Sequence, residues 1–473
     1  IVPGLKAKGL VSFKNWATTN VVRSFTPYFY GIKDYEQGTN GEYNYTYEAI
    51  TKGSKALTTT TSNGGDRLLN YQLSLDYAQT FGDKHDVGAM LVYLQRDYNE
   101  NAPADFYATL PVRNQGIAGR VTYGYDNKYM IEANFGYNGS ENFGEGKRFG
   151  FFPSVAVGYN ISNESFFTPL RNVVSNLKIR GSYGSLGNQA LDNGWYAYLS
   201  NYSTGQTSWI MGSNQPQYVV PGGLVSSSIT WETVTQWDLG LDFNFLNNRL
   251  KGAFDYYQRR TSDILAAGKI LPGILGANEP QENAAESLTK GWEFEISWND
   301  QLASGFHYTV GFNLSDYQSE VTKFDNKSKE LGNWYVGQKQ GEIWGYETYG
   351  LFQSEQEIAG AANQDKVSGG IKLMPGDIRF VDRNNDGVID WGDNTVDNPG
   401  DMKIIGNSTP RYHYGINLGA DWKGFDLGIF FQGVTGCSIN LMSKASNFMP
   451  FNQGKDASSA RMEAMNRWKA SDP

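Results

Sequence analysis

Apolar and polar residues alternate with a period of two along most of the chain. The clearest segments are residues 70–80, 129–138, 237–243, 292–298, 308–314, 412–418 and 425–431. Because successive side chains of a strand point to opposite faces, each segment predicts a strand with one apolar and one polar face. We count about fourteen segments of about ten residues, the length that a tilted strand needs to cross a bilayer.

The connections between these segments alternate between short and long. Short polar turns are expected at 82–85, 126–128, 163–165, 246–249 and 422–424. Long stretches rich in Gly and Asn lie near 97–116, 139–150, 187–230, 262–289 and 318–410. Transmembrane barrels of bacterial outer membranes have short turns on the periplasmic side and long loops outside. The pattern therefore predicts an all-β fold, an antiparallel transmembrane β-barrel.

The alternation also predicts which side chains face lipid. We expect lipid contact for Leu239, Leu241, Ile296 and Phe312. The opposite set, facing the barrel interior, is Asp238, Gly240, Glu295 and Gly311. The alternative fold is a soluble β-sandwich or propeller. No fixed repeat of ~40–50 residues, as propeller blades would give, is present.

Composition agrees with a barrel. Aromatic residues make up 14% of the chain, with 55 Gly and only 15 Pro, which suits pleated sheets. There is no apolar run of ~20 residues, so membrane-spanning helices are excluded. The formal net charge of -9 disfavours nucleic acid as a partner.

Several segments resemble the SusC/RagA family of TonB-dependent outer-membrane transporters. The first is the hairpin at 119–129 (GRVTYGYDNKY), followed by 147–154 (KRFGFFPS). The others are 231–242 (WETVTQWDLGLD), continued by 254–257 and 261–265, and the region from 376–380 (GDIRF) through 382–390 to 424–427. These motifs stand in the family's order and cover nearly the whole chain.

The resemblance implies the function and the partners. Family members are integral outer-membrane barrels with loops facing outside, about twenty-two strands and a plug inside. They import nutrients with energy from TonB and act with a surface lipoprotein of the SusD type. On this basis we expect import of an oligomeric nutrient, a glycan or a peptide. The alternatives are a siderophore-type TonB-dependent receptor, or a surface-exposed β-rich glycan-binding protein without transport.

The resemblance also indicates that residues 1–473 are the middle part of a barrel. About fourteen strands do not close a barrel of about twenty-two, and open edges at membrane depth leave backbone groups unsatisfied. We therefore expect the plug, the TonB-contacting segment and the last strands to lie outside this chain. We expect no stable, closed barrel from these residues alone.

One segment has the spacing of a calcium-binding loop. Oxygen-bearing side chains fall at positions 1, 3, 5, 9 and 12 of residues 382–393, and Gly387 is at position 6. The expected ligands are Asp382, Asn384, Asp386, the Val388 carbonyl, Asp390 and Asp393. Asp393 replaces the Glu that usually closes such a loop, and a polar Asp-Gly turn without metal is the alternative. A bound Ca²⁺ would have a structural role, stiffening an outer loop.

No pattern indicates catalysis, and the chain is not expected to be an enzyme. It contains neither Gly-x-Ser-x-Gly nor His-Glu-x-x-His. Glu293 and Glu295 lie two apart on one strand face, as a glycosidase pair might, but we favour the interpretation that both face a watery lumen or the plug. Alternation places His413 among the interior positions. Candidate substrate-binding aromatic residues in the long connections are Trp195, Trp209, Trp334, Tyr335 and Trp344.

Overall fold

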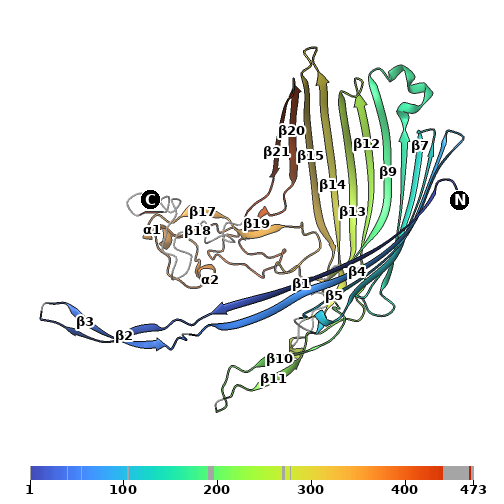
Figure 1. Cartoon of the computed structure of the whole chain (residues 1–473). Helices are drawn as coiled ribbons and strands as arrows, with labels where there is room; N and C mark the ends of the chain where they lie inside the picture. Colours follow the sequence, from blue (N-terminus) through green and yellow to red (C-terminus); the bar gives the residue numbers. More distant parts are fainter. Residues whose placement is uncertain are drawn as a thin grey trace.

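The computed structural model describes residues 2–39, 41–54, 56–103, 106–189, 196–212, 214–268, 272–276, 279–439 and 468–469. One antiparallel sheet of thirteen strands forms most of it (Figure 1). In order across the sheet these are β1 (Leu5–Ser24), β4 (Thr58–Phe81), β5 (His85–Glu100), β6 (Val112–Tyr125), β7 (Tyr129–Ser140), β8 (Phe149–Asn160), β9 (Val174–Asn188), β12 (Glu232–Phe245), β13 (Leu250–Ala267), β14 (Gln281–Gln301), β15 (His307–Lys323), β20 (Tyr412–Trp422) and β21 (Phe425–Thr435). The all-β prediction is confirmed, and thirteen strands agree with the expected number.

The remaining strands form four two-stranded ribbons within the long connections. These pair β2 (Phe29–Gln37) with β3 (Tyr43–Thr51), β10 (Tyr202–Gln206) with β11 (Gln217–Pro221), β16 (Glu342–Tyr346) with β19 (Met402–Asn407), and β17 (Thr348–Leu351) with β18 (Ile378–Phe380). Short helices are α1 (Glu355–Ala359), α2 (Asp365–Ser368), and 3-10 turns at Tyr107–Thr109, Ile161–Asn163, Ser165–Leu170 and Gly273–Leu275. Among the described residues, no helix combines the length and the apolar character needed to cross a membrane.

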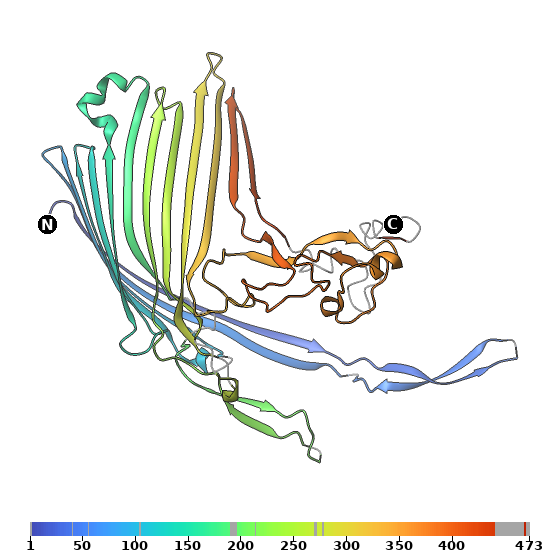
Figure 2. The ribbon, with the colours of Figure 1, turned by 180° about the vertical axis from the view of Figure 1, so that it is seen from behind.

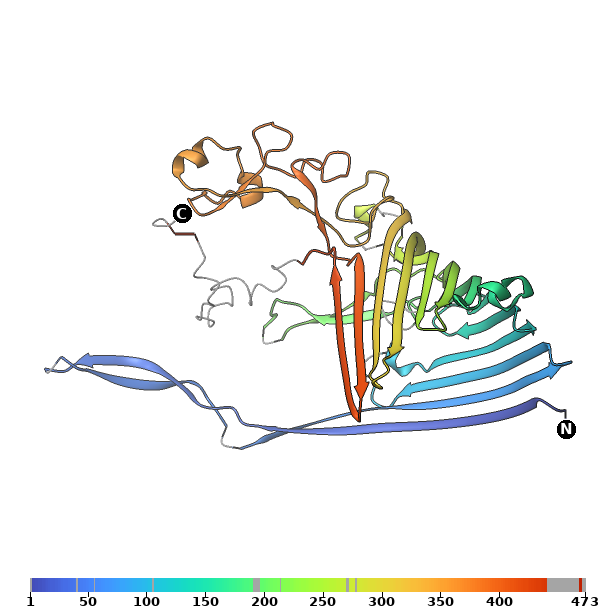
Figure 3. The same cartoon turned by 90° about the horizontal axis from the view of Figure 1, so that it is seen from above.

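The main sheet is a single curved wall. Figures 1 and 2 show its strands side by side, with the tight turns and the connection 161–173 at one end and the other long connections at the opposite end. Figure 3 shows the curvature, and β1 and β21 are the two edge strands. Neighbouring strands of the sheet follow one another along the chain, apart from the strands of the separate ribbons. The wall is therefore an up-and-down meander.

Backbone geometry explains the tight turns. Asp126 and Asn127, between β6 and β7, have φ values of 52° and 50°. Gly82 and Asp83, between β4 and β5, have φ values of 56° and 58°. Positive φ at both central residues matches the right-handed twist of two joined strands, and Asn, Asp and Gly adopt it at the lowest cost. The predicted turn at 163–165 is different, because two 3-10 turns lengthen the connection between β8 and β9 to residues 161–173.

The strands are longer than the ten residues expected from alternation. For example, β14 has 21 residues and β4 has 24. Much of the stretch 262–289, expected to be a loop, continues β13 and begins β14. The sheet therefore extends beyond the length that a bilayer requires, toward the end with the long connections.

A small apolar cluster anchors the long connections to the wall. Phe143 and Ile229 are almost fully buried, and they pack with Phe152 and Trp231. The ring centroids of Phe143 and Trp231 are 5.2 Å apart, and the Trp231 indole N–H donates to the Arg148 carbonyl at 3.0 Å. This cluster joins the connections before β8 and before β12 at one point.

The strand register confirms the separation of the two faces. Leu241 lies opposite Phe254, and Ile296 lies opposite Phe312. Directly opposite residues of an antiparallel pair share a face. Glu295 lies opposite Asn313 on the other face. Leu239 is 55% exposed, as expected of an apolar face that no described part of the chain covers.

The outer-face prediction can be tested with Leu241→Arg in the complete protein. If the apolar face contacts lipid, this change should lower the free energy of unfolding in vesicles by about 2–4 kcal/mol near the bilayer midplane. The matched control is Ser182→Arg, on the opposite face beside Asp238, which should cost much less. Urea titration monitored by heat-modifiable gel mobility measures both. Equal losses for the two variants would contradict lipid contact at Leu241.

Candidate functional site

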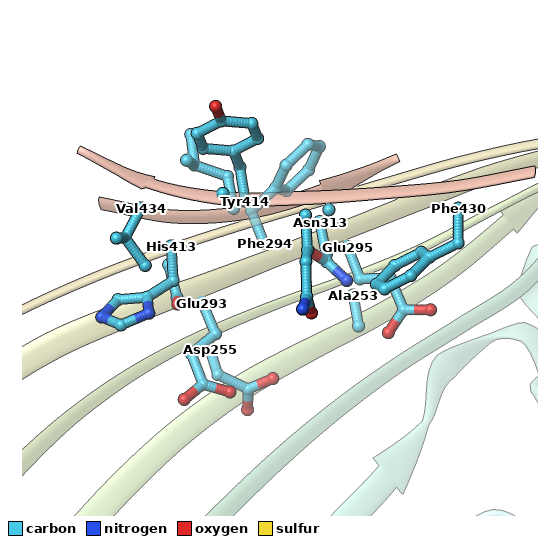
Figure 4. Close-up of a pocket in the computed structure, with 15 residues that line it drawn as sticks. Ala253, Asp255, Glu293, Phe294, Glu295, Asn313, His413, Tyr414, Phe430 and Val434 are labelled. Atoms are coloured by element: carbon cyan, nitrogen blue, oxygen red, sulfur yellow. The ribbon is translucent and has the colours of Figure 1, made fainter. Parts of the chain in front are cut away.

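The polar face of the wall, which carries Asp238, Gly240, Glu295 and Gly311, is called the inner face below. A hollow of about 750 Å³ lies on it between β13 and β21. Figure 4 shows Asp255, Glu293, Glu295, Asn313 and His413 on one side of the ribbon, with the ring of Tyr414 on the other. The remaining inward side chains of its lining are Ala253, Ser315, Phe430, Gln432 and Val434. The prediction that His413 faces the interior is confirmed.

Arg180 of β9 holds three carboxylates together beside this hollow. Its Nη2 donates to Asp255 Oδ2 at 2.6 Å, and its Nε donates to Asp242 Oδ1 at 3.2 Å. Asp238 Oδ1 lies 3.6 Å from Nη1. One guanidinium thus bridges three neighbouring strands. Charge-assisted hydrogen bonds of this kind are about twice as strong as neutral ones.

Gly240 makes room for this arrangement. A Cβ atom at position 240 would lie 2.5 Å from Arg180 Cζ and 2.6 Å from Asp255 Oδ1. Both distances are shorter than a Cβ contact, so any side chain at position 240 would displace the guanidinium or the Asp255 carboxylate from these positions. Alternation alone predicted that Gly240 lies on the inner face. Only the strand register, which places Arg180 and Asp255 opposite it, explains why a glycine is needed there.

The inner face between β12 and β14 carries more negative than positive charge. Arg180 compensates part of the charge of Asp238, Asp242 and Asp255, whereas Glu293 and Glu295 form no ion pair within the described part of the chain. Two further atoms at the hollow, Asp255 Oδ1 and His413 Nε2, are buried without a hydrogen-bond partner in this structure. Buried polar atoms normally have partners, so this wall is suited to further polar contacts.

A second hollow of about 590 Å³ lies on the same face between β4 and β9. It is lined by Asp86, Met130, Glu132, Lys178 and Arg180, among others. Here opposite charges pair locally, since Arg120 Nη2 lies 2.5 Å from Glu132 Oε2. The inner face thus carries polar side chains from β4 to β21, and Asp86 of β5 and Glu293 and Glu295 of β14 are carboxylates on it without an ion pair among the described residues.

The predicted calcium-binding loop is a compact turn within the connection 324–411. Asp382 Oδ2 accepts the Gly387 N–H at 2.9 Å, where Gly387 has φ +85°. Asn384 Nδ2 donates to Asp386 Oδ2 at 2.9 Å. The fully buried Asp401 accepts the backbone N–H groups of Arg383 and Asp390, and so joins the two ends of the loop.

The loop residues fit a cation only in part. Asp382 Oδ1 is buried without a hydrogen-bond partner, and Asn384, Asp386 and Val388 lie in the same turn. Asp390 instead accepts from Lys366 Nζ at 2.6 Å, and Asp393 accepts from Asn398 at 2.9 Å. Within the ranges that the structure describes, no three His, Cys, Asp or Glu side chains are grouped closely enough to hold a metal ion.

Lys366 and Asp390 form an ion pair beside the loop, and each stabilises the charged form of the other. The hydrogen bond from Lys366 lowers the pKa of the Asp390 carboxyl, and the same contact raises the pKa of Lys366. Asp390 therefore stays ionised to lower pH than usual, and Lys366 stays charged to higher pH. The pair is fully charged across the neutral range, so Lys366 acts as the cation next to the loop.

The four candidate substrate-binding aromatic residues that the structure describes lie in two different connections. Tyr335 and Trp344 pack together, with the Trp344 N–H donating to the Tyr335 hydroxyl at 3.2 Å. Burial, followed by the hydrogen bond to Glu342, raises the pKa of Tyr335 to about 12. Trp334 contacts Phe324, and Trp209 lies at the tip of the β10–β11 ribbon with 65% of its side chain exposed. Trp195 lies outside the described residues.

Comparisons with known proteins agree with this architecture. A sequence model described as "TonB dependent receptor-like, beta-barrel" matches residues 11–435. TonB-dependent receptor P3 of Formosa agariphila is 30% identical over 365 residues, covering 74% of this chain and 34% of that protein. TonB-dependent receptor SusC of Bacteroides thetaiotaomicron is 30% identical over 289 residues, covering 59% of this chain and 27% of that protein.

The fold similarity extends to a solved structure described as the RagAB peptide transporter. Its TM-score is 0.66 at 18% identity, covering 92% of this chain and 46% of that chain. The chain spans less than half the length of each of these proteins. Since the family match covers most of the chain, this chain belongs to the TonB-dependent receptor family, in its SusC/RagA type, and its sheet is part of the family's β-barrel.

Proposed function

We propose that the protein containing this chain imports an oligomeric nutrient, a glycan or a peptide, across the bacterial outer membrane. The observation that carries this proposal is the wall itself. One continuous sheet has an apolar outer face and a polar inner face with two hollows. Such a wall separates lipid from a water-accessible interior.

The ends of the wall support an orientation in the membrane. The tight turns lie together at one end with the connection 161–173, and the other long connections lie at the opposite end (Figure 1). Outer-membrane barrels have their short turns on the periplasmic side, so the ribbons and the connection 324–411 would face outside. There they would meet a nutrient and a surface lipoprotein of the SusD type, which would close the barrel from above.

Energy for import would come from TonB, acting on a plug that lies within the barrel in this family. The structure described as a peptide transporter supports a peptide as one candidate substrate. The polar inner face, with its amide and carboxylate groups, suits either a peptide or a glycan, because both present many hydrogen-bond donors. We therefore retain both substrate classes.

Uptake can be separated from binding in cells that carry the complete protein. Labelled oligopeptides and oligosaccharides are offered to cells with and without the gene. Import predicts that accumulation of one class depends on the gene and stops when a protonophore collapses the proton gradient, while binding at the surface persists. A binding protein without transport would show the same gene-dependent signal with and without the protonophore, and that result would contradict the proposal.

The Arg180 cluster gives a second test, of the inner wall. Arg180→Met in the complete protein leaves Asp238, Asp242 and Asp255 without their shared cation. We expect a loss of about 1–3 kcal/mol in the free energy of unfolding, partly screened because the guanidinium is not fully buried. Arg120→Met, which removes a single more exposed ion pair, should cost less.

Rescue distinguishes charge repulsion from lost packing in that test. Adding Asp255→Asn to Arg180→Met removes one of the three carboxylates and should restore part of the loss. Urea titrations of the single and double variants measure it. If the double variant is no more stable than Arg180→Met, mutual repulsion of these carboxylates is not what Arg180 relieves.

We also propose that the loop 382–393 binds Ca²⁺ through Asp382, Asn384, Asp386 and the Val388 carbonyl. The unpartnered Asp382 Oδ1 and the turn at Gly387 support this. Asp390 and Asp393 would join the site only by leaving Lys366 and Asn398. A structural ion would stiffen the connection that contains the buried Phe352 and Ile389.

Limited proteolysis of the complete protein tests the calcium proposal. In calcium buffer the connection 324–411 should be cleaved more slowly than in EGTA, and Asp382→Ala should abolish the difference. Asp397→Ala removes an exposed carboxylate outside the loop and serves as the control. Identical cleavage of the native protein in calcium and in EGTA would contradict calcium binding, and the loop would then be an ordinary polar turn.

A further inference from the structure

The longest projection of the molecule is a two-stranded arm at the end with the long connections. Strand β4 pairs with β5 only from Asp66 onward, whereas its pairing with β1 continues to Thr58. Beyond that point the chain continues as the β2–β3 ribbon. Figures 1 and 2 show this arm reaching far from the wall, without another element along most of its length.

One face of the β2–β3 ribbon is almost entirely apolar. Opposite residues share a face, and the pairs Tyr35–Tyr45, Ile32–Tyr47 and Tyr30–Ala49 lie on the same one. A register shift between Ile32 and Asp34 keeps Ile32 and Tyr35 on that face. The tyrosine face is therefore defined by Tyr30, Ile32, Tyr35, Tyr43, Tyr45 and Tyr47. Each of these side chains is between 46% and 63% exposed.

The other face of the ribbon is polar and acidic. The pairs Asp34–Thr46, Glu36–Asn44 and Gly31–Glu48 lie on it, together with one exposed apolar residue, Ile50, at its end near the wall. The ribbon is thus amphipathic, although within the described structure it has no second layer to cover its apolar face. An isolated two-stranded ribbon is at best marginally stable in water, and it needs a further strand or a packed surface.

The size of the tyrosine face matches a protein interface. Aromatic side chains expose up to about 150–250 Å² each, so six large side chains that are about half exposed present on the order of 600 Å². One partner's share of a standard protein interface is about 800 Å². Tyrosine is also enriched at interface centres, because its rigid ring contributes a large contact area with little loss of side-chain entropy.

Charge argues against a lipid surface as the occupant. Between Phe29 and Thr51 the sequence has Lys33 against Asp34, Glu36, Glu42 and Glu48. Segments that lie on anionic membranes carry clusters of Lys and Arg, which this arm does not. A protein surface is the better match for an apolar face with an acidic back.

A second projection points to where that protein lies. The β10–β11 ribbon leaves the same end of the wall, and Figure 3 shows both ribbons running toward the same side. Its exposed apolar residues include Trp209, Ile210, Met211 and Val219. Two apolar projections on one side of the loop end fit a partner seated over that end.

We infer that the tyrosine face of the β2–β3 arm is a docking surface for the surface lipoprotein that covers the loop end. This inference rests on the proposed function, because that function supplies the lipoprotein. The arm would hold the partner through the tyrosine face and keep its acidic face toward water. Contact with the partner would also stabilise the ribbon itself.

Site-specific photocrosslinking in the complete, membrane-embedded complex tests the inference. A photoreactive phenylalanine analogue is placed at Tyr45 on the tyrosine face, or at its neighbour Thr46 on the acidic face. We expect Tyr45 to crosslink to the lipoprotein, identified by mass spectrometry, and Thr46 to crosslink several-fold less. A crosslink from Tyr45 to a second copy of this chain, to its own barrel or to lipid overturns the inference.

Affinity gives an independent measurement. The triple variant Tyr35→Ser, Tyr45→Ser and Tyr47→Ser should weaken retention of the lipoprotein by about tenfold or more, as for loss of central aromatic contacts. The matched control, Asp34→Ser with Glu48→Ser, changes the opposite face and should retain the partner. Unchanged heat-modifiable mobility shows that the barrel has folded in both variants.

The outcomes separate this inference from the proposed function. If the native receptor binds the lipoprotein and the triple variant binds it equally well, the arm is not the docking surface, while the proposed function stands. If the native receptor binds no lipoprotein, the proposed partnership fails and the inference fails with it. Retention lost equally in the triple variant and in its control also overturns the assignment to the tyrosine face.

Discussion

Every backbone N–H and C=O group at the depth of the hydrocarbon must find its partner on a neighbouring strand, because lipid offers none. The rest of this structure depends on that requirement. It explains why thirteen strands follow one another in a single antiparallel ladder without a crossover. Once the ladder is formed, the register decides which side chains share a face. Apolar contact with lipid and polar contact with the interior are then two results of the same hydrogen bonding.

The polar face has its own electrostatic organisation. Between β4 and β9, charges of opposite sign pair locally, as Arg120 does with Glu132. Between β12 and β14, Arg180 is shared by three carboxylates, and Glu293 and Glu295 of β14 form no ion pair in the described chain. Both glutamates are exposed on the inner face, so this part of the wall presents negative charge to the interior.

The faces of the sheet were predictable from sequence, because a period of two is a local property. Leu241 and Glu295 lie on the faces that alternation predicts. The relation of Arg180 to Asp255 was not predictable, since these residues are 75 positions apart and meet only through the pairing of β9, β12 and β13. The β2–β3 arm was missed as well. Its bulge interrupts the alternation between Ile32 and Asp34, so residues 29–37 do not show a regular period.

The two ends of the wall differ in how they tolerate changes in chain length. In a strand, a shift of one residue moves every side chain to the opposite face. An insertion in the turn at Asp126 and Asn127, which has no slack, would place the polar side chains of β7 against lipid. The connection between β15 and β20 can change length without moving either strand. Over evolutionary time, the long connections can therefore diversify through insertion and deletion, while the tight turns preserve the frame of the barrel.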